Sequence, residues 1–392
     1  MKIGFIRYPV KLYQSGRVLR GGSEIANQHI IDFLKSSNVN VTEFMPENEA
    51  RLKLIDVPAI GTPLMFQELL KQIDEINSCD LIVTTNWFGA IIPEIKVPLV
   101  TIFHSNASMV LDSIKVENIS DSDVLEKWLK LAKPYKIAEK SDQSKHETVI
   151  TIGENYFANN SNKVIAVSQF LKDSLVKYYS ADPKKITAVL NTYPNDWQNI
   201  DLNQNYSGKK IRVVVLTRLP VDHNGFIGKG ADRIFEFFSQ LSNTEKILIA
   251  STKTGSYSKF IEKYAADIKF IENAGRREVG KELAESHISF HPSRCEACQL
   301  TLIEAMLMGN VVITFPVGVA KELIENGKNG FIVNSVGEAV DIIKKLRNQP
   351  EKIKKIAESA RNKILINLSK EKIGNQYLKI FQKISKKKND KN

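Results

Sequence analysis

Residues 288–315 read ISFHPSRCEACQLTLIEAMLMGNVVITF, and the order of the apolar runs in this stretch decides the fold class. A strand-like run, HISFHPS (287–293), precedes a loop, and Glu304 opens an apolar stretch that is typical of a helix. A second strand-like run, VVITF (311–315), follows the helix. Strands that alternate with helices at this spacing indicate a parallel α/β sheet.

The same alternation extends to both sides of this stretch and forms two series. The first contains KIGFIRYPV, VNVTEFMP, CDLIVTTN, PLVTIFHS, KVIAVS and KITAVLN, and the second contains IRVVVLTR, KILIAST, IKFIEN and GFIVN. Between them lies TYPNDWQNIDLNQNYSGKK (192–210), whose polar, non-periodic composition predicts a linker. We predict two Rossmann-like doubly wound domains, residues 1–200 and 201–360, that face each other across a cleft. A C-terminal helix with a basic tail, residues 361–392, is expected to pack back on the N-terminal domain.

The composition is that of a globular protein, with 43% hydrophobic and 25% charged residues, and 392 residues are too many for one ordinary core. The N-terminus enters a strand-like run directly, and no apolar run reaches the roughly 18 residues of a membrane span. Three cysteines do not make a disulfide framework. We therefore expect a cytoplasmic protein.

The net charge of +11 is concentrated at the C-terminal end. Residues 1–200 contain 22 Lys and Arg against 23 Asp and Glu, residues 201–350 contain 20 against 17, and residues 351–392 contain 13 against 4. A solvated helix face is the simpler interpretation, and peripheral contact with the inner membrane face is the alternative. A nucleic-acid partner is disfavoured, because no basic stripe interleaved with aromatic residues is visible, although a local patch could hide in a neutral total.

Glu296 stands in the loop before the helix that Glu304 opens. Backbone N–H groups at a helix N-terminus are unpaired and favour negative charge. One short segment could therefore offer two acceptor carboxylates and several amide donors to one ligand. A sugar nucleotide, with its hydroxyls and diphosphate, needs that mixture.

Further candidate ligand-binding residues stand where predicted strands end or helices begin. Gly21 and Gly22 precede the first helix, where a backbone can approach a phosphate closely. Arg218 ends the strand IRVVVLTR and Lys229 starts a predicted helix, so both could neutralise a diphosphate. His104 follows the strand PLVTIF and could bind a hydroxyl or a phosphate. Turn glycines, solvated cations and a structural histidine remain the alternatives.

Two other constellations have structural interpretations that we favour. Cys295 and Cys298 form C-x-x-C, but a structural zinc site needs about four ligands and no second pair exists. Asp121 and Asp123 form D-S-D before a helix, where Ser and Asp usually act as caps. We therefore predict no metal site.

Several motifs of the chain form a recognisable set. They are GGSE, KVIAVSQFLKDSL, the pair Arg218 and Lys229-Gly230, and PSRCEACQLTLIEAMLMGNVVITF followed by GVAKELIENGKNGFIV. In these motifs, and over nearly its whole length, the chain resembles the retaining GT-B glycosyltransferases of glycosyltransferase family 4. The resemblance implies a GT-B fold and a donor that is a nucleotide-diphosphate sugar, with a UDP-sugar favoured. It implies no cofactor and no bound metal.

The resemblance also implies roles for individual residues. Arg218 and Lys229 would bind the donor diphosphate, Glu304 would hold the ribose, and Glu296 would contact the transferred sugar. The implied catalytic residues are Glu296, Lys229, Arg218 and His104. The implied donor-binding residues are Gly21, Gly22, Arg218, Lys229, Glu296, Gln299, Leu300, Thr301 and Glu304.

The implied reaction is transfer of the sugar, with retention at the anomeric carbon, to a hydroxyl of a glycan, lipid-linked or other acceptor in bacterial-type glycan or glycoconjugate synthesis. In the front-face mechanism proposed for this family, the leaving phosphate takes the acceptor proton. The long helical segment between His104 and KVIAVS is a candidate acceptor-binding element.

Three alternatives stay open at this point: a sugar-nucleotide epimerase, a DNA-modifying glycosyltransferase and a non-catalytic sugar-nucleotide binding protein. The last follows from a departure from the family pattern, since Ala297, Cys298 and Gln299 stand where the family usually has Gly-Phe-Gly. The base, the sugar and the acceptor are not specified by the sequence.

Overall fold

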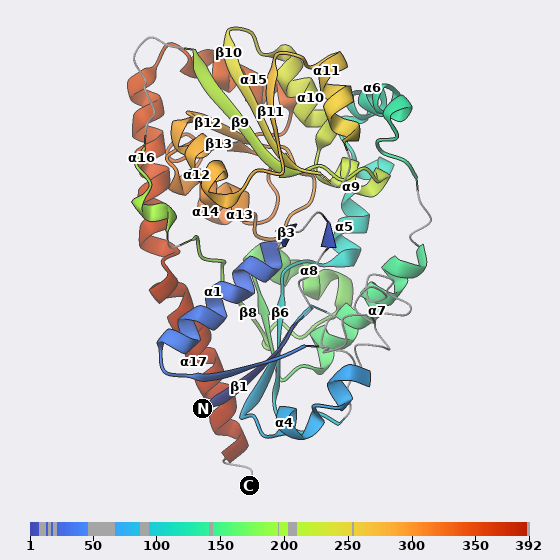
Figure 1. Cartoon of the computed structure of the whole chain (residues 1–392), viewed down its shortest axis with the longest axis vertical. Helices are drawn as coiled ribbons and strands as arrows, with labels where there is room; N and C mark the ends of the chain where they lie inside the picture. The colour runs from blue at the N-terminus through green and yellow to red at the C-terminus, as the bar shows by residue number, and fades with distance from the viewer. Residues whose placement is uncertain are drawn as a thin grey trace. The chain divides into compact units, whose positions relative to one another are not determined.

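The computed structural model describes residues 1–7, 13–14, 17–18, 22–45, 67–86, 94–140, 144–194, 196–202, 210–252 and 255–389. They form two compact units, each built on its own parallel sheet (Figure 1). The first unit comprises Met1–Met109, Asp142–Thr192 and Lys370–Asn392, and the second comprises Val110–Ser141 and Tyr193–Ser369. The predicted fold class, two Rossmann-like α/β domains of the GT-B type, is confirmed.

The sheet of the first unit has the strand order β4-β1-β5-β6-β7-β8, and all neighbours are parallel. Its strands are β1 (Lys2–Ile6), β4 (Asn40–Phe44), β5 (Leu81–Thr85), β6 (Leu99–Phe103), β7 (Lys163–Ala166) and β8 (Ile186–Ala188). The central strand β5 is buried along its whole length. Parallel strands covered on both faces read as continuous apolar runs, which is why the sequence identifies them. A two-stranded antiparallel pair, β2 (Tyr13–Gln14) and β3 (Arg17–Val18), is separate from this sheet.

The helices of the first unit include α17, which lies beside α1 in Figure 1 and packs against it. Phe381 of α17 meets Phe5 of β1 edge-on at 6.4 Å, and Gly374 lies so close to Phe33 of α1 that an added Cβ would overlap its ring. The C-terminal helix is therefore part of the core of the first unit. The helices are α1 (Gly22–Ser36), α4 (Ile73–Asn77), α7 (Ser144–Asn160), α8 (Gln169–Tyr179) and α17 (Lys370–Asn389), and α5 (Ala107–Ser113) begins in this unit.

The sheet of the second unit has the order β11-β10-β9-β12-β13-β14, again all parallel. In chain order this is the 3-2-1-4-5-6 arrangement of a Rossmann fold. Its strands are β9 (Ile211–Arg218), β10 (Thr244–Ser251), β11 (Ile268–Glu272), β12 (Ile288–His291), β13 (Val311–Thr314) and β14 (Phe331–Ile332).

The helices of the second unit are α6 (Ser122–Ala132), α9 (His223–Gly228), α10 (Ala231–Gln240), α11 (Ser256–Tyr264), α12 (Arg276–Glu285), α13 (Leu300–Leu307), α14 (Ala320–Leu323), α15 (Val336–Leu346) and α16 (Pro350–Asn367). Side chains of α6, α9, α10, α11, α15 and α16 share one large apolar core with the sheet. The described part of this unit also contains the short 3-10 turns η1 (Val116–Asn118), η2 (Lys133–Tyr135) and η3 (Trp197–Asn199).

The predicted domain boundary at residue 200 differs from the structure in the segment 110–141, which belongs to the second unit. Helix α6 of this segment packs on α10 and buries Leu125 and Trp128 in the core of the second unit. Because burying such large apolar side chains is strongly favourable, the segment follows the larger core and not its neighbours in sequence. The candidate acceptor-binding element is thus divided between the units.

Two smaller boundaries also differ from the prediction. The expected linker is not simply a linker, because Tyr193 already belongs to the second unit and Trp197 of η3 is 1% exposed. The C-terminal helical region is interrupted at Leu368 and Ser369, so that α16 belongs to the second unit and α17 to the first. No helix in the described ranges combines the length and apolarity needed to cross a membrane.

Candidate functional site

The second unit has a topological switch point between the neighbouring strands β9 and β12. The chain leaves β9 towards β10 on one side and leaves β12 towards β13 on the other. In open α/β sheets, ligands bind where the loops diverge beyond the carboxyl ends of such strands. Arg218 is the last residue of β9, Lys229 follows that strand and Glu296 follows β12, so three predicted site residues flank this point.

The sequence predicts that Lys229 starts a helix, but in the structure this residue stands between two helices. It is the C-cap residue of α9, and Gly230, with φ of +66°, is the N-cap residue of α10. The residues between Arg218 and Lys229 include α9, whose N-cap Asp222 accepts a hydrogen bond from the backbone of Gly225. This segment thus forms a helix that leads directly into Lys229.

Lys229 and Glu296 are brought together by the fold. The Nζ atom of Lys229 donates to Oε1 of Glu296 at 2.6 Å, and the hydroxyl of Ser293 donates to the same oxygen at 3.0 Å. Both charged side chains are partly exposed, at 25% and 19%. Within the described part of the chain, Oε2 of Glu296 remains as an acceptor for another group.

Two glycines allow the backbone around this pair to pack closely. A Cβ on Gly230 would overlap the carbonyl oxygen of Pro292, and its left-handed φ also disfavours other residues. A Cβ on Gly318 would lie 2.9 Å from the carbonyl oxygen of Glu296 and 2.8 Å from that of Ala297. The loop that carries Glu296 therefore depends on glycine at both positions.

Glu304 lies in the middle of α13, not at its start, and is 3% exposed. Arg276, the first residue of α12, donates from Nη1 to Oε1 of Glu304 at 2.9 Å and stacks over the ring of Trp197. Burial raises the pKa of Glu304, while the charge and the hydrogen bond of Arg276 act in the opposite direction. As at Glu296, one carboxylate oxygen is held by a cation.

Arg276 and Trp197 were missed by the sequence analysis. Arg276 comes four residues after the strand IKFIE, a position similar to that of other strand-end cations, and this signal was available. Trp197 gave no signal, because it lies in the polar stretch that predicts a linker.

The remaining predicted site residues of the second unit lie at the start of α13 or at the end of β9. Gln299 is the N-cap residue of α13 and is 5% exposed, and Leu300 and Thr301 are the first residues of that helix. Their backbone N–H groups belong to the helix N-terminus, where anions are favoured. Arg218 is the last residue of β9 and is exposed.

The predicted residues of the first unit lie in a different environment. His104 follows β6, and its Nε2 contacts Oδ1 of Asn27 at 2.9 Å. Because the amide nitrogen of Asn27 donates to Thr85, Oδ1 acts as the acceptor and Nε2 of His104 as the donor. Burial lowers the pKa of His104 to about 4, so the imidazole is neutral at pH 7. Gly22 is the first residue of α1, and Gly21 lies outside the described residues.

A buried carboxyl group, Glu154 of α7, adjoins this site and was also missed. It accepts hydrogen bonds from the backbone of Ala107 at 2.7 Å, the hydroxyl of Tyr179 at 2.7 Å and the amide of Asn86 at 3.0 Å. Asn86 in turn accepts from the backbone of His104 at 2.8 Å. Burial raises the pKa of Glu154 to about 7. Its helix is mostly polar, so no periodicity marks this position as buried.

The C-x-x-C pair and the D-S-D motif, for which we favoured structural interpretations, give different results. Cys295 and Cys298 form no disulfide bond, and burial raises the pKa of Cys295 to about 11. Asp121 has the N-cap position of α6 but makes no capping hydrogen bond, so the prediction of a cap is wrong for this side chain. Across the described ranges, no group of three or more His, Cys, Asp or Glu residues is arranged to hold a metal ion.

Comparison with known proteins gives matches over both halves of the chain. The model of glycosyltransferase family 4 matches residues 21–194, and the model of glycosyl transferases group 1 matches residues 225–363. Trehalose synthase of Pyrococcus horikoshii is 31% identical over 121 residues, which are 30% of this chain and 29% of that protein. The chain therefore spans less than a third of this relative in the aligned stretch.

Solved structures match over nearly the whole chain. Sucrose-phosphate synthase of Thermosynechococcus elongatus is similar with a TM-score of 0.72 and 15% identity, covering 98% of each chain. HepE of Anabaena in complex with UDP and glucose is similar with a TM-score of 0.67 and 18% identity, covering 98% of this chain and 100% of that one. At these identities the similarity shows the GT-B fold. Together with the two family models, it shows that the chain belongs to the glycosyltransferases of the family 4 and group 1 type.

Proposed function

We propose that this protein is a retaining glycosyltransferase that moves a sugar from a nucleotide-diphosphate sugar to an acceptor hydroxyl without a bound metal. One observation carries the proposal. Glu296 and Glu304 each have one carboxylate oxygen bound by a cation, Lys229 and Arg276 respectively, and their second oxygens have no partner in the described residues. Such oriented carboxylates suit hydroxyl groups of a sugar and a ribose.

Lys229 is the group that would stabilise the departing diphosphate. It is a partly exposed cation at the switch point, and α13 begins after the same loop that carries Glu296. A diphosphate bound there would share Lys229 with Glu296, while Arg218 would supply a second cation. Preorganised cations act on the charge that develops on the leaving group, so they lower the barrier to transfer and not only the Kd of the donor.

The acceptor proton requires a base, and we propose the leaving phosphate for this role. His104 is a neutral hydrogen-bond donor through Nε2 to Asn27, which suits contact with a sugar hydroxyl through its other ring nitrogen. Proton transfer to the leaving phosphate on the face of attack is consistent with retention at the anomeric carbon.

A UDP-sugar is the favoured donor. Structures of HepE of Anabaena, which is similar in fold, are complexes with UDP, with UDP and glucose, and with UDP-glucose. The family models that match are those of glycosyltransferases, which favours transfer over epimerisation or a purely binding function. The acceptor is a glycan, a lipid-linked molecule or another hydroxyl compound.

The test is Lys229→Ala, assayed for transfer and for donor hydrolysis with a panel of nucleotide sugars chosen by thermal stabilisation. Loss of one such contact costs about 3 kcal/mol, which lowers the rate on the order of a hundredfold. Lys269→Ala is a matched control, because it breaks another Lys–Glu pair, Lys269 with Glu282 at 2.5 Å, in the same unit. That pair is largely exposed on the lysine side and is worth about 0–1 kcal/mol. A wild-type rate in Lys229→Ala would contradict the diphosphate assignment.

A further inference from the structure

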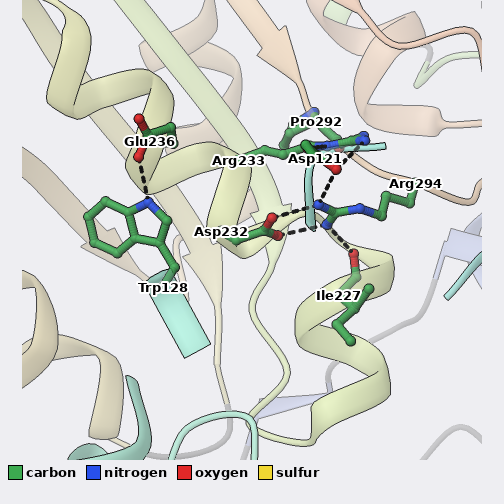
Figure 2. A network of polar contacts seen from close by, with 8 residues as sticks. All are labelled: Asp121, Trp128, Ile227, Asp232, Arg233, Glu236, Pro292 and Arg294. Atoms are coloured by element: carbon green, nitrogen blue, oxygen red, sulfur yellow. Dashed lines mark hydrogen bonds and ion pairs between the residues drawn. The ribbon is translucent and has the colours of Figure 1, made fainter. Parts of the chain in front are cut away.

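Residues 110–141, named here the docked segment, stand in the N-terminal half of the sequence but belong to the second unit. Two groups of polar contacts hold α6 of this segment to α10 (Figure 2). In the first, Trp128 donates from Nε1 to Glu236 at 2.9 Å. In the second, the carboxylate of Asp121 contacts Arg233 and Arg294. The second group reaches the loop that carries Glu296.

Figure 2 shows Arg294 between two carboxylates, those of Asp121 and Asp232. Its Nη2 atom donates to Asp121 at 2.8 Å and to Asp232 at 2.6 Å, and its Nη1 atom donates to the other oxygen of Asp232 at 2.7 Å. Arg233 donates from Nε to Asp121 at 2.5 Å and from Nη2 at 3.2 Å. Two cations and two anions therefore balance in a nearly closed network.

The network is tied to both backbone segments that hold the Lys229–Glu296 pair. Arg233 donates from Nη1 to the carbonyl oxygen of Pro292 at 3.1 Å. Arg294, two residues before Glu296, donates from its backbone N–H to Gly228 at 2.9 Å and from Nη1 to Ile227 at 3.0 Å. The turn before Lys229 and the loop before Glu296 are thus joined through the two arginines.

Asp121 is the member of the network that comes from the docked segment. Burial raises its pKa, but the hydrogen bonds and charges of Arg233 and Arg294 outweigh burial, and the net pKa is lowered. The side chains of Arg233 and Arg294 are 7% and 4% exposed, so water cannot readily replace Asp121 as their hydrogen-bond partner. Removal of one partner from such a buried network leaves an uncompensated charge.

We propose that Asp121 is a positioning residue for the donor site: it fixes Arg233 and Arg294, which hold the loop Pro292–Glu296 against the turn Gly228–Lys229. The consequence for catalysis rests on the proposed function, whereas the positioning of the loop does not. The docked segment would thus contribute to a site whose paired charged residues, Lys229 with Glu296 and Arg276 with Glu304, all lie after residue 200.

The first experiment measures loop order without any ligand. Hydrogen exchange is followed in peptides that cover residues 292–299 of the full-length protein, in the wild type, Asp121→Asn and Glu236→Gln. In Asp121→Asn we expect exchange in this loop to be about tenfold faster or more. Glu236→Gln weakens the other attachment of α6 and is the matched control, with unchanged exchange in the loop. Equal exchange in wild type and Asp121→Asn, or an equal increase in both variants, would overturn the proposal.

A second variant covers the case in which Asp121→Asn fails to fold. In Asp121→Asn/Arg233→Met, one anion and one cation are removed together, so Arg294 and Asp232 remain as a balanced pair. The carbonyl of Pro292 still loses its donor, so faster exchange in residues 292–299 is expected in a folded protein. Slow, wild-type exchange in this double variant would also overturn the proposal.

The catalytic consequence is measured with UDP-glucose as the probe, by its Kd and by the rate of UDP release. Asp121→Asn is expected to lower kcat on the order of tenfold or more, because a misplaced loop misaligns the reacting groups. Asp121→Glu, which restores the charge, should recover part of the rate, and Glu236→Gln should stay within about twofold of the wild type. If the wild type neither binds nor turns over any nucleotide sugar, the proposed function fails while the exchange result still decides the positioning role. Normal kcat in Asp121→Asn, with an active wild type, would overturn the inference alone.

Discussion

The candidate site residues of the two units lie in clusters of polar groups of different kinds. In the second unit, cations are paired with carboxylates, Lys229 with Glu296 and Arg276 with Glu304. In the first unit, His104 and Glu154 lie in a network of neutral amide and hydroxyl groups, where burial holds the pKa of His104 at about 4 and that of Glu154 at about 7. The cluster around His104 and Glu154 is thus mainly neutral, whereas the two clusters of the second unit are ion pairs; elsewhere in the first unit, Arg7 after β1 pairs with Glu24 and Glu43.

This difference shows that burial and neighbouring charges decide which ligand groups a residue suits, even when the fold is the same. Lys229 and Glu296 form a partly exposed ion pair, and a cation in such a position suits a phosphate-bearing ligand. Buried groups without a counter-ion favour their neutral forms and suit neutral hydroxyls. The division is a property of the packing around each residue and not of the residue type, since a glutamate occurs in both units.

The largest expected effect concerns the buried carboxyl group of the first unit. Because the folded-state pKa of Glu154, about 7, lies above its ordinary value of 4.5, its contribution to stability is full below pH 4.5 and is lost as the pH rises through 7. This accounts for about 3 kcal/mol of stability between pH 4.5 and about pH 8. Glu154→Gln should remove this decrease, as measured by urea denaturation at both ends of the range. Glu75→Gln, at an exposed position of the same unit, is the control.

The pH effect tests the claim that the first unit holds a neutral network. If Glu154→Gln loses stability with pH as steeply as the wild type does, Glu154 is ionised in the folded protein and the contrast between the units disappears.

The next effect concerns the backbone of the charged site. Gly230→Ala should destabilise the protein by about 2 kcal/mol, because a left-handed φ and an overlap with the Pro292 carbonyl both oppose the new side chain. Transfer should fall with stability, because Lys229 is adjacent. Gly255→Ala is the matched control, since no atom lies within 4 Å of its added Cβ. Thermal denaturation of the two variants decides the point, and equal Tm values would show that the loop tolerates displacement.

A smaller effect is expected at the second ion pair. Glu304→Gln keeps the shape but removes the charge that faces Arg276, so donor KM should rise about tenfold, equivalent to about 1.5 kcal/mol, with a smaller change in kcat. Steady-state kinetics with the donor identified by thermal stabilisation measures this split. A change confined to kcat would place Glu304 at the reacting centre, not at the ribose.

The smallest effect is expected at His104. His104→Ala should lower the transfer rate about fivefold, the value of one neutral hydrogen bond of about 1 kcal/mol. The ratio of wild-type to variant rates should be constant above about pH 5.5, because the imidazole is neutral well above its pKa of about 4. A ratio that changes between pH 6 and pH 8 would mean that His104 titrates there and that the neutral-network description of the first unit is wrong.

The sequence by itself determined the α/β class and most of the strands, because strands covered on both faces are read as apolar runs whatever their neighbours are. It also identified Lys229, Glu296 and Glu304 as candidates, since their loops and helices are local features of the chain. That Lys229 meets Glu296 depends on the adjacency of β9 and β12, which are separated by two intervening strands in the sequence.

Only the tertiary structure decided where the docked segment belongs and what Asp121 does. A D-S-D motif before a helix predicts a cap, and the arginines that bind Asp121 instead are 112 and 173 residues away in the sequence. Likewise Glu154 lies in a polar helix, and only packing against Asn86 and Tyr179 buries it. Local patterns record local preferences, whereas ion pairing and burial depend on which distant segments the core brings together.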